Sequence, residues 1–537
     1  MGVSENMSAP GFIAMTYARP FPPGAEGEVL RDYYTGVLFQ WSETDSAWYA
    51  VLATEKAFTL YVNGGTGNNA NAGDAANPLL TISEAIRRLP PRIRHDVVID
   101  VADNAGAVLL YDERVIIENF TLENNATFRI VGKSRQVAAI AANAASTGTN
   151  RTWTIVPNPA WVVNVHVGKY VLFSAGPHAG KVAWILANTA DTLTLGYRPL
   201  PAEGAYGPTD AGDIREISTQ LQRSGAPAVN YSLIVKDVQA MQLVNNGLSV
   251  EYMHVMGDAT NRYAIGFSGQ GSANFTGCRV DDLVYANPHT GGYYLFESCL
   301  AWTCRNIADG RWFETTPGST FRLSFTAGGV IGGVCLTYQN PGATTFSQTN
   351  FETDPAIPAN TPPQLIEFSG TLASFALCSM NGGGIATPIY CSGSGSGDLS
   401  LGGMDIFGSD TSGIKCSTEA MSSVHIRIDE NVSAALPVSN IHDNQQFGID
   451  LTGPARLSFF NATVGLANQS AGLLVGGVRM RDGAVAGFYG TIGQEPTIQD
   501  GAGNKVNFDD RTPALVIGYD VETAGLETQS LYVYRGI

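Results

Sequence analysis

Short apolar segments recur along this chain, and apolar and polar residues alternate within each of them. Alternation with a period of two places one set of side chains on each face of a β-strand. The segments lie at residues 248–253, 273–278, 294–299, 321–325, 374–378, 399–401 and 424–428. Repetition of one strand pattern after roughly 20 to 30 residues is typical of a solenoid. The spacing therefore predicts a stack of coils, in which each coil packs on its two neighbours.

The length of the chain supports an elongated architecture. At 537 residues it exceeds the size at which a single hydrophobic core usually stops growing, and a solenoid has no such limit because each coil brings its own section of core. Charged residues make up 15% of the chain and glycine occupies 61 positions, which disfavours a bundle of helices with charged surfaces. We expect an all-β protein.

The cysteines fit the same repeat. Seven are present without any C-x-x-C pair, so the sequence indicates neither a zinc ribbon nor a disulfide framework. Cys278 and Cys299 stand 21 residues apart, and Cys391 and Cys416 stand 25 apart, each beside an apolar segment. Because a reduced cysteine behaves as a small apolar side chain, we interpret these residues as stacked core positions rather than reactive thiols.

Residues 1–57 differ from the rest of the chain. Tyr, Phe and Trp residues flank the dipeptide Thr35-Gly36, which can supply a tight turn between two strands. A small hairpin unit with an aromatic core is therefore expected. The pattern is similar to the TG-x-LY-x-W…W modules that recur in phage fibre proteins, which implies attachment to a virion; a folded leader without a docking role is the alternative.

Residues 60–91 combine a strand, a loop rich in Gly and Asn, and a short helix. Thr81 and Glu84 have the spacing of a helix capping box. The helix would end at Pro90-Pro91 and bury an apolar face made of Ile82, Ala85, Ile86 and Leu89. Because the open end of a parallel solenoid exposes apolar side chains and unpaired strand groups, we expect this helix to cap that end.

The same string resembles the opening YV-(D/N)-x-x-x-G-(N/D)-(D/N)…G…NP-x-x-T-(I/L)-x-x-A-(I/L) of the pectate-lyase-like right-handed β-helix family, which includes phage tailspikes. The similarity covers about thirty residues of this chain. It implies a right-handed parallel β-helix and, as in tailspikes, a homotrimer. A nucleotide or calcium loop is the alternative for the Gly/Asn segment, but no Gly-Lys-Ser/Thr follows it and its acidic residues are sparse.

Residues 150–218 interrupt the repeat. The strings at 168–173 and 188–195 alternate like the arms of antiparallel hairpins, which predicts an inserted antiparallel β subdomain similar to small β-inserts of phage β-helix proteins. A patch that only adds stability is the alternative. The predicted organisation is an attachment module at 1–57, the capping helix and first coils at 58–149, the insert at 150–218, the β-helix core at 219–481 and a C-terminal closure at 482–537.

Aromatic and charged residues are densest between residues 293 and 314. Sugars are bound by stacking on aromatic rings beside carboxylates and guanidinium groups. The candidate carbohydrate-binding residues are Tyr293, Trp302, Arg305, Arg311 and Trp312. The candidate catalytic carboxylates, of the kind that glycoside hydrolysis uses in pairs, are Asp282, Glu297 and Asp309. The alternative is that the aromatic side chains belong to the core, namely Tyr294, Phe296 and Trp302, and that the charged side chains only keep this flank solvated.

Charge and motifs exclude several classes of protein. The net charge of −17 excludes a nucleic-acid partner, because nucleic acids bind proteins largely through Lys and Arg that displace counterions. The seven histidines show no ligand spacing, and no zinc-protease, nucleophile-elbow or phosphate-loop motif is present, so we expect no metal ion and no cofactor. The sequence starts without a secretion signal and carries no run of about 20 apolar residues, so we expect synthesis in the host cytoplasm and no membrane insertion.

Together with the resemblance, these patterns indicate a phage fibre or tailspike protein of the virion that recognises a bacterial surface polysaccharide during host adsorption. Its N-terminus would attach to a tail or capsid protein, and a symmetric homotrimer would present repeated weak sugar sites that gain by avidity. A polysaccharide depolymerase of the tailspike type, either a hydrolase or a lyase that uses Asp and Glu, stays open as an alternative. A purely structural virion fibre is another; a free bacterial pectate-lyase-like enzyme should carry a secretion signal.

Overall fold

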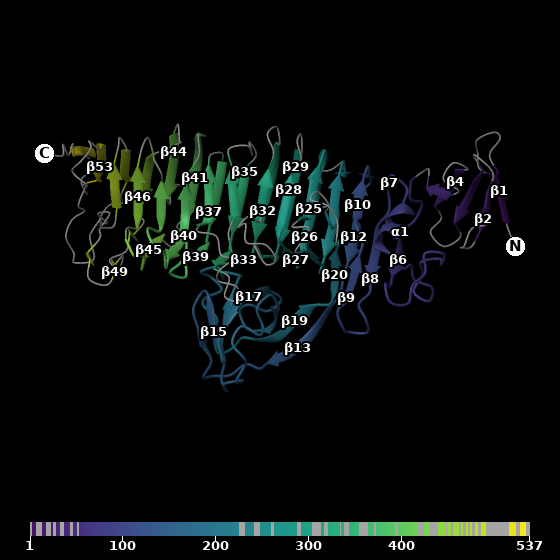
Figure 1. Cartoon of the computed structure of the whole chain (residues 1–537), viewed down its shortest axis with the longest axis horizontal. Helices are drawn as coiled ribbons and strands as arrows, with labels where there is room; N and C mark the ends of the chain where they lie inside the picture. Colours follow the sequence, from purple (N-terminus) through teal and green to yellow (C-terminus); the bar gives the residue numbers. More distant parts are fainter. Residues whose placement is uncertain are drawn as a thin grey trace. The chain divides into compact units, whose positions relative to one another are not determined.

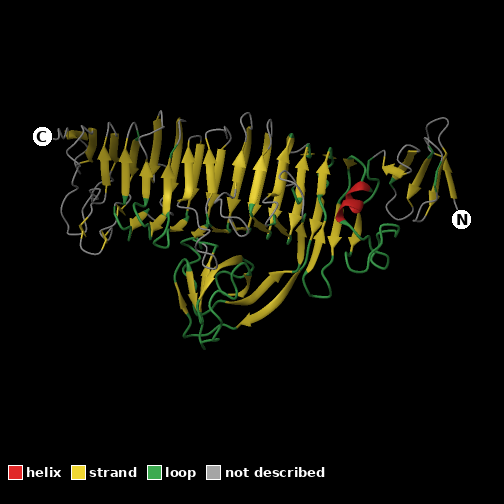
Figure 2. Ribbon diagram, viewed as in Figure 1, coloured by secondary structure: helices red, strands yellow, loops and turns green. Residues whose placement is uncertain are grey.

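The computed structural model describes residues 53–224 without a break. It also describes residues 3–6, 13–17, 23–24, 28–32, 37–42 and 47–50 before this range, and 231–240, 247–258, 263–286, 291–302 and further segments between 313 and 532 after it. The chain divides into a first compact unit of residues 1–135, 216–280 and 284–295 and a second of residues 136–215, 281–283 and 296–537. Among the described residues, all regular structure is β except one short helix (Figure 2).

The first unit begins with the small β module that the sequence predicts. Its sheet has the order β1 (Val3–Asn6), β2 (Ile13–Tyr17), β3 (Val29–Asp32), β4 (Leu38–Ser42) and β5 (Ala47–Ala50). The pairs β3–β4 and β4–β5 are antiparallel. Trp41 meets Trp48 edge-on with ring centroids 5.4 Å apart, over a small core that includes Leu30 and Phe39. The aromatic hairpin core is thus confirmed, and Thr35-Gly36 lies outside the described residues.

The predicted capping helix is present as α1 (Ile82–Arg87). It packs on β6 (Phe58–Val62), β8 (Val97–Val101) and β10 (Val115–Glu118). Ile82, Ala85 and Ile86 are buried beneath it, as the apolar periodicity predicts. The helix therefore covers apolar side chains of the first coils.

Half of the predicted capping box forms. The Oγ of Thr81 accepts a hydrogen bond from the backbone N–H of Glu84 at 3.1 Å. The carboxylate of Glu84 does not complete the box; it pairs with Arg87 and Arg88. The N–H groups of Ile82 and Ser83 instead donate to the carboxylate of Glu113, at 2.8 and 3.0 Å. Glu113 lies about 30 positions further along the chain and supplies acceptors for N–H groups that the first turn of a helix leaves unpaired.

After α1 the chain forms a parallel β-helix, in which each coil gives one strand to each of three sheets. In the first unit the first sheet runs β6-β8-β12-β23-β26, the second β9-β20-β24 and the third β10-β21-β25. The bounds are β9 (Leu109–Asp112), β12 (Phe128–Val131), β20 (Thr219–Gln222), β21 (Leu233–Lys236), β23 (Leu248–Glu251), β24 (His254–Met256), β25 (Tyr263–Ser268) and β26 (Gln270–Thr276). Val97, Phe128 and Leu248 stack in register and are fully buried, so successive coils share one core.

The second unit by itself has the same three-sheet construction (Figure 1). Its first sheet comprises β32 (Thr320–Thr326), β35 (Ala343–Ser347), β38 (Leu372–Ala376), β41 (Ser396–Gly402), β44 (Ser423–Ile428), β47 (Arg456–Phe460), β52 (Val485–Tyr489) and β53 (Leu515–Val521), followed by the antiparallel β54 (Glu527–Tyr532). The second sheet comprises β30 (Leu300–Trp302), β33 (Gly329–Ile331), β36 (Asn350–Glu352), β39 (Ser379–Asn381), β42 (Asp405–Phe407), β45 (Asn440–His442) and β48 (Thr463–Val464). The third sheet comprises β34 (Val334–Thr337), β37 (Gln364–Ser369), β40 (Thr387–Cys391), β43 (Ile414–Cys416), β46 (Ile449–Thr452) and β51 (Val478–Arg481).

The all-β prediction and the parallel β-helix are confirmed. Every apolar segment predicted between residues 248 and 428 overlaps a strand of the first sheet. The sequence prediction passed over β35, whose segment ATTFS buries Thr344 and Phe346 but has few apolar residues.

A single residue with left-handed backbone turns the chain from the first sheet to the second. The residues with this conformation include Ser298, Ala327, Gln348, Leu377 and Gly403, with φ between 50° and 61°. Cys299 and Cys378 directly follow two of these corners and are buried, and Cys278 follows the equivalent Gly277. Cys391 and Cys416 are in-register partners on β40 and β43. The cysteine spacing thus reflects stacked core positions, as predicted.

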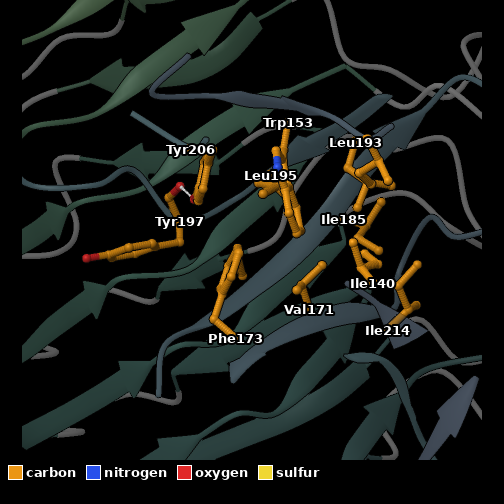
Figure 3. Packing of buried hydrophobic residues seen from close by; sticks show 12 residues of the cluster. Ile140, Trp153, Val171, Phe173, Ile185, Leu193, Leu195, Tyr197, Tyr206 and Ile214 are labelled. Carbon is orange, nitrogen blue, oxygen red and sulfur yellow. Dashed lines mark hydrogen bonds between the residues drawn. The ribbon is translucent and has the colours of Figure 1, made fainter. Parts of the chain in front are cut away.

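The predicted antiparallel insert is confirmed as part of the second unit. Its sheet has the order β13 (Ser134–Ile140), β19 (Ala211–Ile217), β16 (Tyr170–Ala175), β17 (Val182–Asn188), β18 (Thr192–Leu195), β15 (Thr152–Thr154) and β14 (Thr147–Gly148). Trp153, Phe173 and Tyr206 fill its core together with aliphatic side chains (Figure 3). Because β13 and β14 belong to it, the sheet begins before residue 150.

The insert docks on the second sheet within the same unit. The N–H of Asn350 donates to the carbonyl of Gly196 at 2.7 Å, and the N–H of Arg198 donates to the carbonyl of Gln348 at 3.0 Å. A Cβ atom added at Gly196 would lie 2.7 Å from the Cα of Gly329, so the two backbones are in direct contact. The insert is therefore held by main-chain hydrogen bonds beside β33 and β36.

Candidate functional site

The sequence-predicted site residues lie in different environments. Tyr293 is 44% exposed and Glu297 is also exposed, both at outward positions of β29 (Gly291–Glu297). Trp302, Tyr294 and Phe296 are buried, which confirms the alternative that these three are core side chains. The predicted residues outside the described part of the chain are Arg305, Asp309, Arg311 and Trp312.

Asp282 occupies a corner of the coil. It follows β27 (Arg279–Asp281) with φ of 69°, and its N–H donates to the carbonyl of Trp302 at 2.9 Å. Its exposed fraction is 3%, and the neighbouring Asp281 is fully buried. Asp282 and Trp302 are thus buried while Tyr293 and Glu297 face outward, so these four residues do not form one exposed group.

Another set of polar side chains lines the second sheet of the second unit. β36, β39, β42 and β45 are three-residue strands with buried middle residues. Because side chains alternate along a strand, the first and third residues of each point outward. In register, the first residues are Asn350, Ser379, Asp405 and Asn440, and the third residues are Glu352, Asn381, Phe407 and His442. We name Glu352, Asn381, Asp405, Phe407 and His442 the polar ladder.

The polar ladder is buried where the insert docks and partly exposed on the following coils. Asn350 is fully buried and Glu352 is 7% exposed, where the insert docks. Asn381, Phe407 and His442 are each partly exposed on the following coils. One end of the ladder is therefore fixed beneath the insert, and the other is partly exposed.

Arg151 of the insert holds the buried end of the polar ladder. Its guanidinium forms an ion pair with the carboxylate of Glu352 and donates to the Oγ of Ser379 at 2.8 Å. It lies over the ring of Phe407, with its central carbon 5.4 Å from the ring centroid. The other oxygen of Glu352 accepts from the amide of Asn381 at 2.7 Å. Charge-assisted hydrogen bonds of this kind fix side-chain orientation as well as charge.

His442 occupies the open end. Its Nε2 lies 3.0 Å from Asp405 Oδ1 and its Nδ1 lies 2.7 Å from Asp443 Oδ2. Its ring stacks on Phe407 with centroids 5.2 Å apart. The hydrogen bond with Asp405 raises the pKa of His442 above its ordinary value of 6.5; partial burial opposes this shift and Asp443 adds to it. The two carboxylates thus favour the protonated imidazole.

The arrangement suits binding better than proton transfer. Glycoside hydrolases that invert configuration need a water molecule between two carboxyl groups that are roughly 6.5 to 9.5 Å apart. The imidazole of His442 stands between Asp405 and Asp443 and bonds to both, so it fills that space. Glu352 is engaged by Arg151 and Asn381. What the ladder offers a ligand is a row of oriented donors, acceptors and one aromatic ring.

Metal binding and membrane crossing find no support in the described part of the chain. There, no group of three His, Cys, Asp or Glu side chains is placed to hold a metal ion. The helix found among the same residues, α1, is too short to cross a membrane.

Sequence analysis missed the polar ladder, although a weak signal existed. The strings Asn-Phe-Glu, Ser-Met-Asn, Asp-Ile-Phe and Asn-Ile-His at 350–352, 379–381, 405–407 and 440–442 each place an apolar residue between two outward ones. Each string is too short to identify as a strand by periodicity alone. Arg151 had no sequence signal, because 201 positions separate it from Glu352.

Comparison with known proteins gives structural similarities only. No family model and no curated protein sequence matches the chain. The gp54 tailspike of Acinetobacter baumannii bacteriophage AP22, solved in complex with A. baumannii capsular saccharide, is 9% identical with a TM-score of 0.21, over 79% of this chain and 75% of the tailspike. The gp49 tailspike of Pseudomonas phage LKA1 is 11% identical with a TM-score of 0.20, over 82% of this chain and 68% of the tailspike. A structure described as a glycoside hydrolase is 10% identical with a TM-score of 0.21, over 80% and 94% of the two chains.

Proposed function

We propose that this chain is a fibre or tailspike-type protein of a phage virion that binds a polysaccharide on the bacterial surface through the polar ladder. The observation that carries the proposal is the ladder itself. The amide of Asn381, the phenyl ring of Phe407 and the imidazole of His442 follow one another in register on β39, β42 and β45. The carboxylate of Asp405 lies in the neighbouring row, and all four groups are partly exposed. A polyol ligand suits this mixture, because its hydroxyl groups donate and accept hydrogen bonds while its C–H groups contact the exposed parts of aromatic rings.

The backbone beneath the polar ladder favours an extended ligand. Neighbouring strands lie about 4.8 Å apart, so in-register side chains repeat at that interval along the β-helix. A polymer that runs across the strands could contact one ladder residue after another. Sites built on strands hold their side chains more accurately than sites on loops, and pre-oriented groups lose less entropy on binding.

Charge argues against a polyanionic nucleic acid at the same surface. Asp405 and Asp443 flank the open end, and the side chain of Asp443 is 60% exposed. The protein as a whole carries a net charge of −17. Phosphate groups would be repelled there, whereas sugar hydroxyls would not.

Assembly and attachment complete the proposal. By the family resemblance, three chains form a homotrimer on an external appendage of the virion, and the β module of β1–β5 attaches to a tail or capsid protein. A trimer offers three copies of a weak site, so that binding to a polyvalent surface exceeds the affinity of each copy.

Depolymerase activity is the second candidate, because the carboxylates of Asp405 and Asp443, both at least partly exposed, lie beside His442. For cleavage, His442 would have to leave the position in which it bonds both aspartates. A lyase or hydrolase of the tailspike type would then use an acidic pair.

One experiment distinguishes glycan binding, depolymerase activity and a purely structural role. Purified full-length protein is incubated with capsular polysaccharides and whole cells from a panel of candidate hosts, and polymer size and retention of the protein on cells are both followed. The binding proposal expects retention with unshortened polymer. Shortened polymer would establish a depolymerase instead, and neither retention nor shortening on any host would leave a structural fibre.

A further inference from the structure

The outer face of the first sheet in the second unit carries a row of hydroxyl side chains. Ser324, Thr345, Ser374 and Ser400 are in register on β32, β35, β38 and β41, and each is at least partly exposed. The next position in the row is Arg427 on β44, and Ser458 on β47 follows it. The hydroxyl row is thus followed, on the next strand, by the guanidinium group of Arg427.

The neighbouring row contains two consecutive basic residues. Asp398, His425 and Arg456 are in-register partners on β41, β44 and β47. Together with Arg427 they form what we name the basic cluster: Asp398, His425, Arg427 and Arg456. Arg456 is exposed, and the side chains of Arg427 and His425 are 35% and 29% exposed.

Hydrogen bonds orient the basic cluster. The guanidinium of Arg427 donates to Asp398 Oδ1 and to His425 Nδ1, both at 3.2 Å. The Nε2 of His425 lies 2.7 Å from the Oγ of Ser458. Arg427 is thus held between two neighbouring strands while part of its side chain stays accessible, which is the condition for a pre-oriented anion contact.

The charge of this surface is opposite to that of the protein. The whole chain has 48 acidic and 31 basic residues. The basic cluster has two arginines against a single aspartate. Its location on the first sheet also separates it from the polar ladder, which belongs to the second sheet.

We propose that the basic cluster, together with the hydroxyl row, binds a carboxylate-bearing polysaccharide, with Arg427 and Arg456 contacting the carboxylates and the Ser and Thr hydroxyls contacting the sugar. Guanidinium groups match the planar, two-oxygen geometry of a carboxylate. The hydroxyl row favours a sugar polymer over a simple anion, because it extends over four coils on one side of the cluster. The proposal concerns a different surface from the polar ladder and stands without it.

Binding to defined polymers tests this assignment. The full-length protein is titrated at low salt with polygalacturonate, alginate and hyaluronan, and with fully methyl-esterified polygalacturonate as the uncharged counterpart. At least one acid polymer should bind, more tightly than the ester, and Arg427→Gln and Arg456→Gln should each weaken that binding about tenfold. Arg456→Lys, which keeps the charge but loses the planar fork, should weaken it less than Arg456→Gln.

Matched variants keep the result interpretable. Arg129→Gln removes an arginine from the outer face of β12 in the first unit and should bind the acid polymers as the wild type does. The arginine variants leave the polar ladder unchanged, and the ladder variants are measured on host polysaccharide, so failure here is distinct from failure of the proposed function. The assignment is overturned if no acid polymer binds more tightly than the ester, if folded Arg427→Gln and Arg456→Gln bind like the wild type, or if single-stranded DNA binds this surface more tightly than the polysaccharides.

Discussion

Arg151 and Glu352 form a largely buried ion pair that joins the insert to β36 across 201 positions of sequence. The exposed fractions of the two side chains are 12% and 10%. The same guanidinium lies over Phe407, and the same carboxylate accepts from Asn381. This one contact therefore contributes both to docking of the insert and to orientation of the polar ladder.

Replacing Arg151 should reveal how much this contact stabilises the protein. Arg151→Ala leaves the carboxylate of Glu352 buried without its cation, which should lower the free energy of unfolding by about 3 kcal/mol. Arg129→Ala is the control, because Arg129 also pairs with a glutamate, Glu251, but its side chain is 42% exposed. It should cost less than about 1 kcal/mol. Urea unfolding of both variants measures these two losses of stability. Equal losses would contradict the claim that the buried Arg151–Glu352 pair stabilises the protein more than the exposed pair.

A methyl group at Gly196 should loosen the insert. Its Cβ would meet the Cα of Gly329 at 2.7 Å, so Gly196→Ala should force the docked backbones apart and cost about 1 to 3 kcal/mol. Limited proteolysis should then cut the insert faster than in the wild type. At Gly207, also in the insert, the nearest atom to an added Cβ is 3.8 Å away, so Gly207→Ala should leave the cleavage rate unchanged. If the protease cuts the insert of Gly196→Ala as slowly as that of the wild type, the contact between Gly196 and Gly329 is dispensable.

His442 should make stability depend on pH in a definite direction. Its pKa is raised in the folded protein, chiefly by Asp405, so its contribution is fully present below the ordinary pKa of 6.5 and is lost as pH rises through the folded value. The difference in unfolding free energy between wild type and His442→Gln should therefore shrink as the pH is raised from 6 upward. Histidine NMR titration of the wild type and of Asp405→Asn gives an independent measure, and an unchanged His442 pKa in Asp405→Asn would refute the stated cause.

The proposed assembly has a simple readout. Sedimentation equilibrium of the full-length protein should give three times the 56.8 kDa mass of one chain. A protein that sediments as a single chain at micromolar concentration would contradict the homotrimer and would remove the avidity argument with it.

Local features of this fold could be predicted from sequence. Thr81 and Glu84 predict the start of α1, because a helix cap depends on residues three positions apart. The strand pattern at 424–428 and its counterparts are visible because alternation is a property of the strand itself. The contribution of Glu113 to the same helix start was not predictable, because it depends on how the coils stack.

The polar ladder could not be predicted for a related reason. Phe407 and His442 stand 35 positions apart, and only the register of β42 with β45 brings their rings together. The sequence instead favoured the segment around Tyr294 and Trp302 as the site because it is rich in aromatic residues. These two aromatic side chains belong to the buried core. Arg151 belongs to the insert, and no local pattern indicates which coil the insert will meet.

Affinity of ladder variants for a host polysaccharide tests the central claim most directly. With the polymer that retains the wild-type protein, biolayer interferometry should show that Phe407→Ala and Asn381→Ala each weaken binding at least about tenfold. Tyr390→Ala, a partly exposed aromatic on β40 of the third sheet, should bind as the wild type does. If both ladder variants are folded and bind the polysaccharide with wild-type affinity, the ladder is not the glycan-binding surface.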